Sequence, residues 1–196
     1  MSKDKIFIFD TTLRDGAQTE GVDFSLEDKN KIANVLSDIG IDYIEGGWPG
    51  ANPIDTKFFS KPPKTKKSIF TAFGMTKRSG RSADNDPGLA SLINAETSAV
   101  CVVGKTWDFH VKVALGVKNE ENLENIRETT KHFVNHKKEF LFDAEHFFDG
   151  YKANSNYALD CLKNAYDSGA RWIVLCDTNG GTLPNEVREI VEQVTK

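Results

Sequence analysis

The sequence predicts an α/β fold, a (β/α)8 TIM barrel of which this chain carries about six β/α units. Short β-branched or aromatic segments alternate with longer segments of helical period, and most of the short ones are apolar on both faces, as in a parallel sheet covered by helices. Their starts at residues 6, 43, 68, 99, 140 and 172 are 25 to 41 residues apart. Eight such units need roughly 250 residues, the usual size of a closed barrel. The pattern leaves open one alternative, a complete six-stranded doubly wound sheet.

The strands are expected where β-branched and aromatic residues gather. In the fifth strand, Asp143 and Glu145 share one face, whereas Phe140 and Phe142 share the other. If helices cover the phenylalanine face, the two carboxylates point into the mouth of the barrel. The six expected strands are Ile6–Asp10, Tyr43–Gly46, Ser68–Phe73, Ala99–Val103, Phe140–Ala144 and Trp172–Cys176.

Capping residues and apolar period predict the helices. The first helix opens with a capping-box pattern, Ser25-Leu26-Glu27-Asp28, and Gly40 closes it. Four later helices are expected to begin at Asp86-Pro87, Asn119, Ser155 and Pro184. The helix that begins at Ser155 is predicted to bury a stripe made of Leu159, Leu162 and Tyr166.

Composition excludes several classes of protein. Of the 196 residues, 39% are hydrophobic and 28% are charged, as in a globular protein, and no apolar stretch approaches the roughly 20 residues of a transmembrane helix. A net charge of −4 argues against binding to nucleic acid or to an anionic membrane, and the apolar run Ile6–Phe9 is too short for a signal-peptide core, so export is not expected. A cytoplasmic protein is therefore expected. The three cysteines are too few for a disulfide framework, so we interpret them as reduced, buried apolar residues: Cys101, Cys161 and Cys176.

Acidic residues gather at the ends of the predicted strands, where barrels of this type form their active sites. They occur within Asp10–Gly16, Glu45–Pro49, Asp143–His146 and Asp177–Gly181. Carboxylates that recur at one end of a sheet, followed by glycine turns, are typical of a cation site or an acid–base site. A single aspartate could equally cap the turn that follows it. The set as a whole favours a functional site.

Two histidines have a spacing that also occurs at metal sites. His132 and His136 stand at i and i+4, a legitimate zinc spacing on a helix. They lie in a polar segment, however, and no glutamate follows the first of them as in a metalloprotease motif. We therefore interpret both as solvated surface residues.

The segment Asp10-Thr11-Thr12-Leu13-Arg14-Asp15-Gly16-Ala17-Gln18 resembles the signature that opens isopropylmalate, homocitrate and citramalate synthases and their lyase relatives. Motifs similar to those of this family follow in the expected order, at Tyr43–Pro49, Phe142–Tyr151 and Leu175–Gly181. Two further segments resemble the citramalate synthase branch, and they are Gly80–Pro87 and Val103–His110. The resemblance covers essentially the whole chain.

The resemblance implies a Claisen-type condensation in which acetyl-CoA and a 2-oxo acid give a 2-hydroxy-2-methyl diacid. Pyruvate and (R)-citramalate are the expected substrate and product. A divalent cation, Mg²⁺, Mn²⁺ or Zn²⁺, would chelate the keto acid and polarise its carbonyl group. By analogy with the family, Asp15 is a metal ligand, and Arg14 donates to the keto oxygen as it becomes an alkoxide.

The resemblance gives roles to other residues as well. Thr178 and Asp143 are expected to contact the substrate, and Glu145 is expected to position it or to assist enolisation of acetyl-CoA. Glu45 is expected to pair with Arg14, in a structural or a substrate-binding role. Apart from the resemblance, charge and location alone suggest that the basic residues after the third strand face the phosphates of CoA, and they are Lys77, Arg78 and Arg81.

The resemblance also implies that residues 1–196 are the N-terminal part of a catalytic barrel domain, truncated on its C-terminal side, in an enzyme that forms a homodimer. The family's other two metal ligands form a His-x-His pair on a seventh strand, and no histidine follows His146. The chain alone is therefore expected to bind metal weakly, to lack activity and either to self-associate through its outer strands or to be partly disordered near Lys196. Two alternatives are a lyase that cleaves a hydroxyacyl-CoA, and a non-catalytic chain that acts by pairing with a partner segment.

Overall fold

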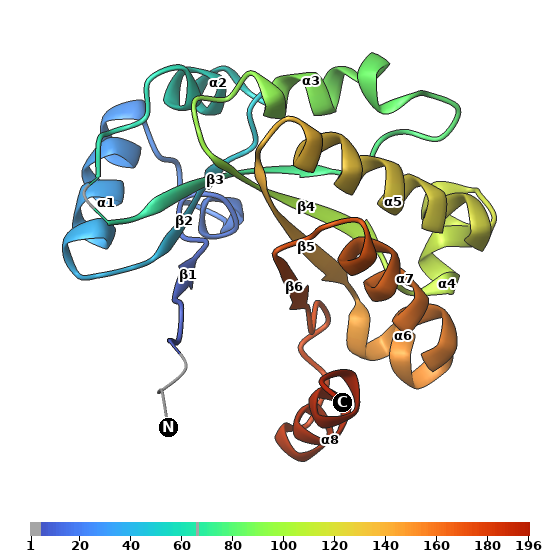
Figure 1. Cartoon of the computed structure of the whole chain (residues 1–196). Helices are drawn as coiled ribbons and strands as arrows, with labels where there is room; N and C mark the ends of the chain where they lie inside the picture. The colour runs from blue at the N-terminus through green and yellow to red at the C-terminus, as the bar shows by residue number, and fades with distance from the viewer. Residues whose placement is uncertain (1–4, 66) are drawn as a thin grey trace.

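The computed structural model describes residues 5–65 and 67–196, and in them six parallel strands form one sheet. The strands are neighbours in chain order, from β1 to β6, and the sheet curls into an open half-barrel (Figure 1). A doubly wound sheet would reverse its strand order at a switch point, so that alternative is wrong. The strands are β1 (Phe9–Asp10), β2 (Tyr43–Gly47), β3 (Ile69–Met75), β4 (Ala99–Lys105), β5 (Glu139–Glu145) and β6 (Trp172–Leu175).

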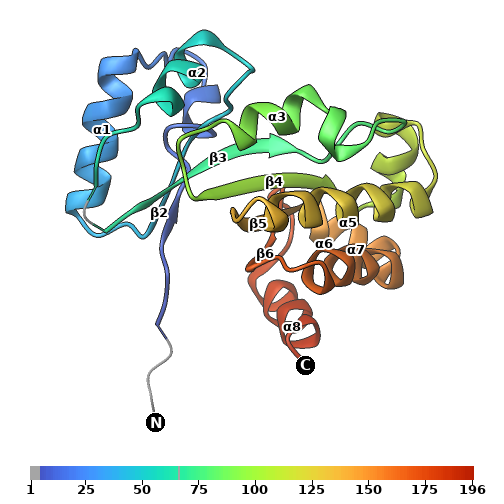
Figure 2. The same cartoon turned by 45° about the horizontal axis from the view of Figure 1, so that its top comes forward.

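Helices cover the convex outer side of the curl, as the two views in Figures 1 and 2 show. The expected capping box is present, because the Ser25 side chain accepts the Asp28 N–H and the Asp28 carboxylate accepts the Ser25 N–H. The helices are α1 (Leu26–Asp38), α2 (Pro53–Ser60), α3 (Pro87–Ile93), α4 (Asp108–His110), α5 (Asn119–Asn135), α6 (Phe147–Ala153), α7 (Ser155–Asp167) and α8 (Pro184–Val194), with the short turns η1 (Gly16–Gln18), η2 (Ala83–Asn85) and η3 (Val111–Leu115). None of the helices in the described residues is long and apolar enough to cross a bilayer.

Two apolar regions lie on opposite faces of the sheet. The larger one fills the space between the strands and the helices and includes Phe140, Phe142 and Ala144 of β5. The smaller one lies inside the curl and consists of Ala99, Cys101 and Leu141, with Phe9, Ile69 and Trp172 packed against it. The alternation predicted for the fifth strand is therefore correct, because its phenylalanine side chains face the helices and the opposite face lines the interior.

Two sequence expectations about these elements were wrong. The first strand is only Phe9–Asp10, because Ile6 is 85% exposed and the segment before Phe9 joins β2 mainly through the carbonyl oxygen of Ile8. In α7, Leu159 and Tyr166 are exposed, at 37% and 69%, although a buried stripe was predicted there. The helix instead buries the side that packs on α5 and α6, which carries Tyr157, Ala158, Cys161, Leu162 and Ala165.

An aromatic cluster occupies the inner face of the half-barrel at the N-terminal ends of its strands. The ring centroids of Phe7 and Trp172 are 5.1 Å apart, although the two residues come from the first and last strand regions. The Tyr43 hydroxyl donates to Glu139 at 2.6 Å and accepts the Trp172 indole N–H at 3.1 Å. This cluster holds the two ends of the sheet toward each other, and the polar residues lie at the opposite end of the strands.

The open sheet gives a testable expectation for residues 1–196 expressed alone. Among the described strands, β1 and β6 each pair with a single neighbour, and such free edges recruit other strands. We expect the chain to self-associate, and Val174→Lys, which places a charge on β6, to shift the population toward monomer in size-exclusion chromatography with light scattering. Asn185→Lys, on the exposed side of α8, adds the same charge and should leave the mass unchanged. A monomeric wild-type chain would contradict this expectation.

Candidate active site

The loop after β1 carries Arg14 and Asp15, and it folds around a single carbonyl group. The carbonyl oxygen of Thr11 accepts the backbone N–H groups of Arg14, Asp15 and Gly16 at 3.0, 2.8 and 3.1 Å. The Asp10 carboxylate accepts both the N–H and the hydroxyl of Thr12. These local bonds explain why the Asp-Thr-Thr-Leu-Arg-Asp-Gly sequence forms a tight turn at the carboxyl end of the strand.

The Arg14 guanidinium is fixed from three sides at the mouth of the half-barrel. Its Nε donates to Glu45 at 2.6 Å and its Nη1 to Asp15 at 2.9 Å. Its Cζ lies 4.0 Å from the centroid of the Phe73 ring, which gives a cation–π contact. Within the described residues no hydrogen bond uses Nη2, so that part of the fork remains able to donate to a ligand.

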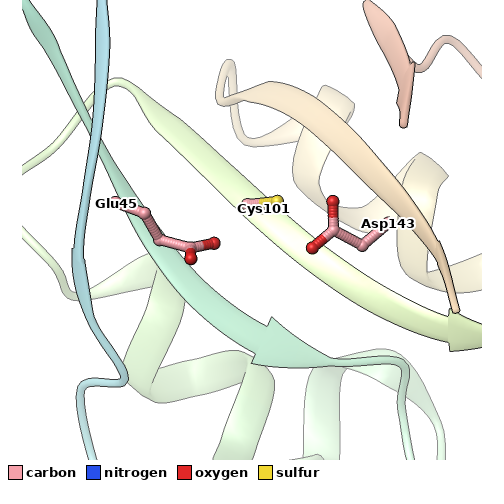
Figure 3. Close-up of side chains that lie close together, drawn as sticks. All are labelled: Glu45, Cys101 and Asp143. Atoms are coloured by element: carbon pink, nitrogen blue, oxygen red, sulfur yellow. The ribbon is translucent and has the colours of Figure 1, made fainter. Parts of the chain in front are cut away.

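Inside the half-barrel, three side chains converge from three different strands (Figure 3). Glu45 and Cys101 are fully buried and Asp143 is 9% exposed, and their ligand atoms all lie within 4.8 Å of one another. Burial raises the pKa of Glu45 to about 7, although the charge of Arg14 opposes the shift. Burial likewise raises the pKa of Asp143, and it raises that of the Cys101 thiol well above its ordinary value.

The charges around the cluster bear on what it can hold. The two buried carboxyl groups share one cation, Arg14, with the exposed Asp15, and burial favours the protonated form of the thiol. A divalent ion in the same space would face the Arg14 guanidinium and would require the thiol to ionise. We therefore interpret Glu45, Cys101 and Asp143 as the buried support of Arg14, and not as the metal site that the resemblance implies.

The implied metal instead fits the exposed side of Arg14, where Asp15 lies. The Asp15 side chain is 62% exposed, and one of its oxygens is bound to Arg14. A carboxylate at the rim is a suitable ligand for a hard or borderline divalent cation. In the part of the chain that the structure describes, Asp15 belongs to no group of three metal-ligating side chains. Among the described residues at this rim, Asp15 would therefore be the one ligand for such an ion, and further groups would have to fill its other positions.

A buried ion pair holds the Arg14 loop against the end of β2. Lys29 of α1 is 3% exposed, and its ammonium group donates to the carbonyl oxygens of Leu13 and Gly46, both at 2.9 Å. It also pairs with Asp55 of α2, which accepts the Trp48 N–H at 2.8 Å. Lys29 thus connects the residue before Arg14 with the residue after Glu45.

Gly47 makes the approach of Asp55 possible. Its φ of +139° is disfavoured for other residues, and a Cβ atom at this position would lie 2.5 Å from the Asp55 carboxylate. The glycine pair after β2 therefore has a packing function, and the Asp55 carboxylate occupies the space that an anion would need to reach Gly47.

Glu145 and Thr178 lie at the ends of β5 and β6. Glu145 forms an ion pair with Lys105, the last residue of β4, and both side chains are largely buried. The Thr178 hydroxyl oxygen accepts the backbone N–H of His146 at 2.9 Å, which leaves its own proton free to donate. The structure thus groups Arg14 with Asp15, Glu45 and Asp143, and it places Glu145 and Thr178 on the neighbouring strand ends.

Several participants at this end of the strands could not be identified from the sequence. Lys29 carries no motif, and Cys101 looks like any small buried residue. His110 of α4 and His146, the residue after β5, lie together, with ring centroids 4.3 Å apart and both Nδ1 atoms buried without a hydrogen bond in the described residues. Lys77 was expected to face CoA phosphates, and this was wrong because its ammonium group donates to Arg81 O and pairs with Glu128.

Glu45 predicts a pH dependence of stability. In the unfolded chain it ionises near its ordinary pKa, whereas in the folded protein it keeps its proton up to a pH of about 7. Between these values the folded state binds more protons, so stability falls as pH rises. We expect wild type to lose about 2–3 kcal/mol more than Glu45→Gln between pH 5 and pH 8. Urea unfolding of both proteins at the two pH values measures this, and parallel pH profiles would refute the assignment.

Comparisons with known proteins agree with an incomplete (β/α) barrel that carries polar residues at its mouth. The structure superimposes on the HMG-CoA lyase of Bacillus subtilis with a TM-score of 0.79 at 18% identity, covering 98% of this chain and 65% of that one. This likeness confirms the barrel fold. Residues 5–196 match the HMGL-like family model, and the chain belongs to that family.

Relatives with higher sequence identity are synthases. The chain is 55% identical over 193 residues to the (R)-citramalate synthase of Aquifex aeolicus. The match covers 97% of this chain and 37% of that protein. It is 51% identical to the (R)-citramalate synthase of Geobacter sulfurreducens, over 96% of this chain and 36% of that protein. A 2-isopropylmalate synthase from Sulfurisphaera tokodaii is 30% identical. The resemblance inferred from the motifs is confirmed, and the chain spans little more than a third of the citramalate synthases that it matches.

Proposed function

We propose that residues 1–196 form the N-terminal part of the catalytic barrel of an acyltransferase that condenses acetyl-CoA with pyruvate to give (R)-citramalate. The observation that carries this proposal is the fixed Arg14–Asp15 pair at the barrel mouth, in a chain 55% identical to a citramalate synthase. The enzyme is a cytoplasmic homodimer whose other partners are these two small molecules.

Arg14 is the group that stabilises the developing charge. Glu45 and Asp15 hold the guanidinium by two of its nitrogens, and Phe73 holds its plane, so Nη2 donates to the keto oxygen as it gains negative charge. Because the donor is already in place, little reorganisation accompanies the reaction. The Asp143 carboxylate lies close enough to Arg14 to interact electrostatically with its guanidinium. It contacts the substrate from the interior of the half-barrel.

Glu145 and Thr178 act on the two ends of the reacting pair. Glu145 accepts a proton from the methyl group of acetyl-CoA, or positions that group, with Lys105 as its counter-ion. The Thr178 hydroxyl donates to the carboxylate of the keto acid, because the His146 N–H already occupies one acceptor position of its oxygen. Asp15 contributes a ligand to a divalent cation, Mg²⁺, Mn²⁺ or Zn²⁺, which supplies Lewis-acid polarisation of the keto group when bound.

The test uses the full-length protein that carries this chain. A free-thiol assay measures CoA release from acetyl-CoA with pyruvate, 2-oxoisovalerate or 2-oxoglutarate, and chiral chromatography identifies the product. We expect release with pyruvate, formation of the (R) product, and loss of activity with a chelator. Release only with another keto acid would reassign the substrate. Cleavage of a hydroxyacyl-CoA without condensation would assign the lyase reaction instead.

A further inference from the structure

A second cluster of ionisable residues lies away from the barrel mouth, where α5 packs against η2. His132 lies in the last turn of α5 and His136 caps the C-terminus of that helix, and their ring centroids are 4.5 Å apart. Asp84 of η2 approaches the first ring, with its Oδ1 3.1 Å from His132 Nδ1. The His132 side chain is only 9% exposed, so the expectation that it is solvated was wrong, whereas His136 is exposed as expected.

The hydrogen bonds around the two rings determine their tautomers. His136 Nδ1 lies 2.8 Å from the backbone carbonyl oxygen of His132, which can only accept, so this nitrogen carries the proton. His132 Nδ1 faces the Asp84 carboxylate, which likewise accepts. Each neutral ring therefore keeps its lone pair on Nε2, and no hydrogen bond within residues 5–65 and 67–196 uses either Nε2 atom.

Such rings resemble the ligands of a metal site before the ion binds. Histidine ligands usually donate their other nitrogen to a carboxylate or a backbone carbonyl, which orients the ring and raises its basicity. Here the His132 ring faces a carboxylate, and the His136 ring donates to a backbone carbonyl. Burial lowers the pKa of His132, although the Asp84 carboxylate opposes the shift.

We propose that His132 and His136 bind a transition-metal ion through their Nε2 atoms, with Asp84 orienting the first ring. Two imidazoles suit Zn²⁺, Ni²⁺ and Cu²⁺, with Cu²⁺ bound most tightly, and disfavour Mg²⁺. Water completes the coordination, so the ion exchanges freely. Because Asp84 belongs to η2 and the histidines to the C-terminal end of α5 and its cap, the bound ion also strengthens the contact between these two elements.

The test is a titration of the full-length protein with ZnCl₂, followed by calorimetry and by long-range ¹H–¹⁵N spectra of the histidine rings. Without metal, both rings should show the Nδ1–H tautomer, and Zn²⁺ should shift both Nε2 signals together. His136→Gln should remove one equivalent of bound Zn²⁺, and Asp84→Asn should weaken binding at the same site about tenfold. Asp15→Asn, at the barrel mouth, should leave this equivalent in place.

Three results would overturn the proposal. They are an Nε2–H tautomer in either ring, Nε2 signals that Zn²⁺ leaves unshifted, and an unchanged Zn²⁺ stoichiometry in His136→Gln. Because His136 is exposed, that variant is expected to fold normally, and circular dichroism verifies this. The measurement does not depend on condensing activity, so its outcome is separate from that of the proposed function.

Discussion

Arg14→Lys is expected to lower the turnover of the full-length enzyme roughly 10²–10³-fold, which is the usual cost of losing one preorganised donor at a developing oxyanion. Lysine keeps the positive charge but loses the planar fork that binds Glu45 and Asp15 simultaneously. It also loses the stacking on Phe73. The remaining ammonium group is free to rotate and no longer holds a fixed donor at the keto oxygen.

Steady-state kinetics, metal binding and a control variant together test this effect. Steady-state kinetics should show a fall in kcat that exceeds any rise in KM for pyruvate, because the contact strengthens in the transition state. Metal binding, measured by calorimetry, should stay close to that of wild type because Asp15 remains. Arg188→Lys, an exposed position on α8, makes the same chemical change and should leave turnover unaltered. Near-normal turnover of Arg14→Lys would assign Arg14 a structural role.

Lys29→Met is expected to destabilise the protein by about 3–5 kcal/mol, the usual cost of removing one partner from a buried ion pair. The Asp55 carboxylate would remain 6% exposed without its counter-ion, and the carbonyl groups of Leu13 and Gly46 would lose a donor. A loss of this size is a large part of the total stability of an ordinary domain. Because Leu13 precedes Arg14, the loop should also become more mobile.

The matched control lies on the same helix. Lys31 also pairs with an acidic residue, Glu27, but both side chains are at least 69% exposed, so Lys31→Met should change stability by less than about 1 kcal/mol. Urea unfolding measures both variants, and hydrogen exchange of the Arg14 and Asp15 amides reports on the loop. Equal effects of the two substitutions would show that the buried Lys29–Asp55 pair does not anchor the Arg14 loop.

Much of the fold could be predicted because its signals are local. The capping box at Ser25, the alternation in β5 and the apolar strands each depend on neighbouring residues, and the structure contains all three. The stripe of α7 could not be predicted as securely. Two overlapping sides of that helix carry apolar residues, and the packing of α5 and α6 decides which side is buried.

The candidate site shows the same division. The sequence indicated Arg14, Asp15, Glu45 and Asp143 because carboxylates and an arginine follow strands whose ends must meet at one edge of a parallel sheet. It did not indicate Lys29, because a single lysine on a helix is ordinarily a solvated residue. It also did not indicate Cys101, whose thiol lies beside the carboxyl groups only after β2, β4 and β5 have curled together.

The sequence by itself determined the order of strands and helices, their inner and outer faces in the sheet, the family and the residues gathered at the mouth. These properties follow from local capping, from the two-residue and 3.6-residue periods and from motif order. Only the tertiary structure decided which charges are buried and paired. Arg14 and Glu45 are 31 residues apart, and Lys29 and Asp55 are 26 apart. Desolvation and ion pairing depend on which side chains arrive from distant segments, and no local pattern specifies that.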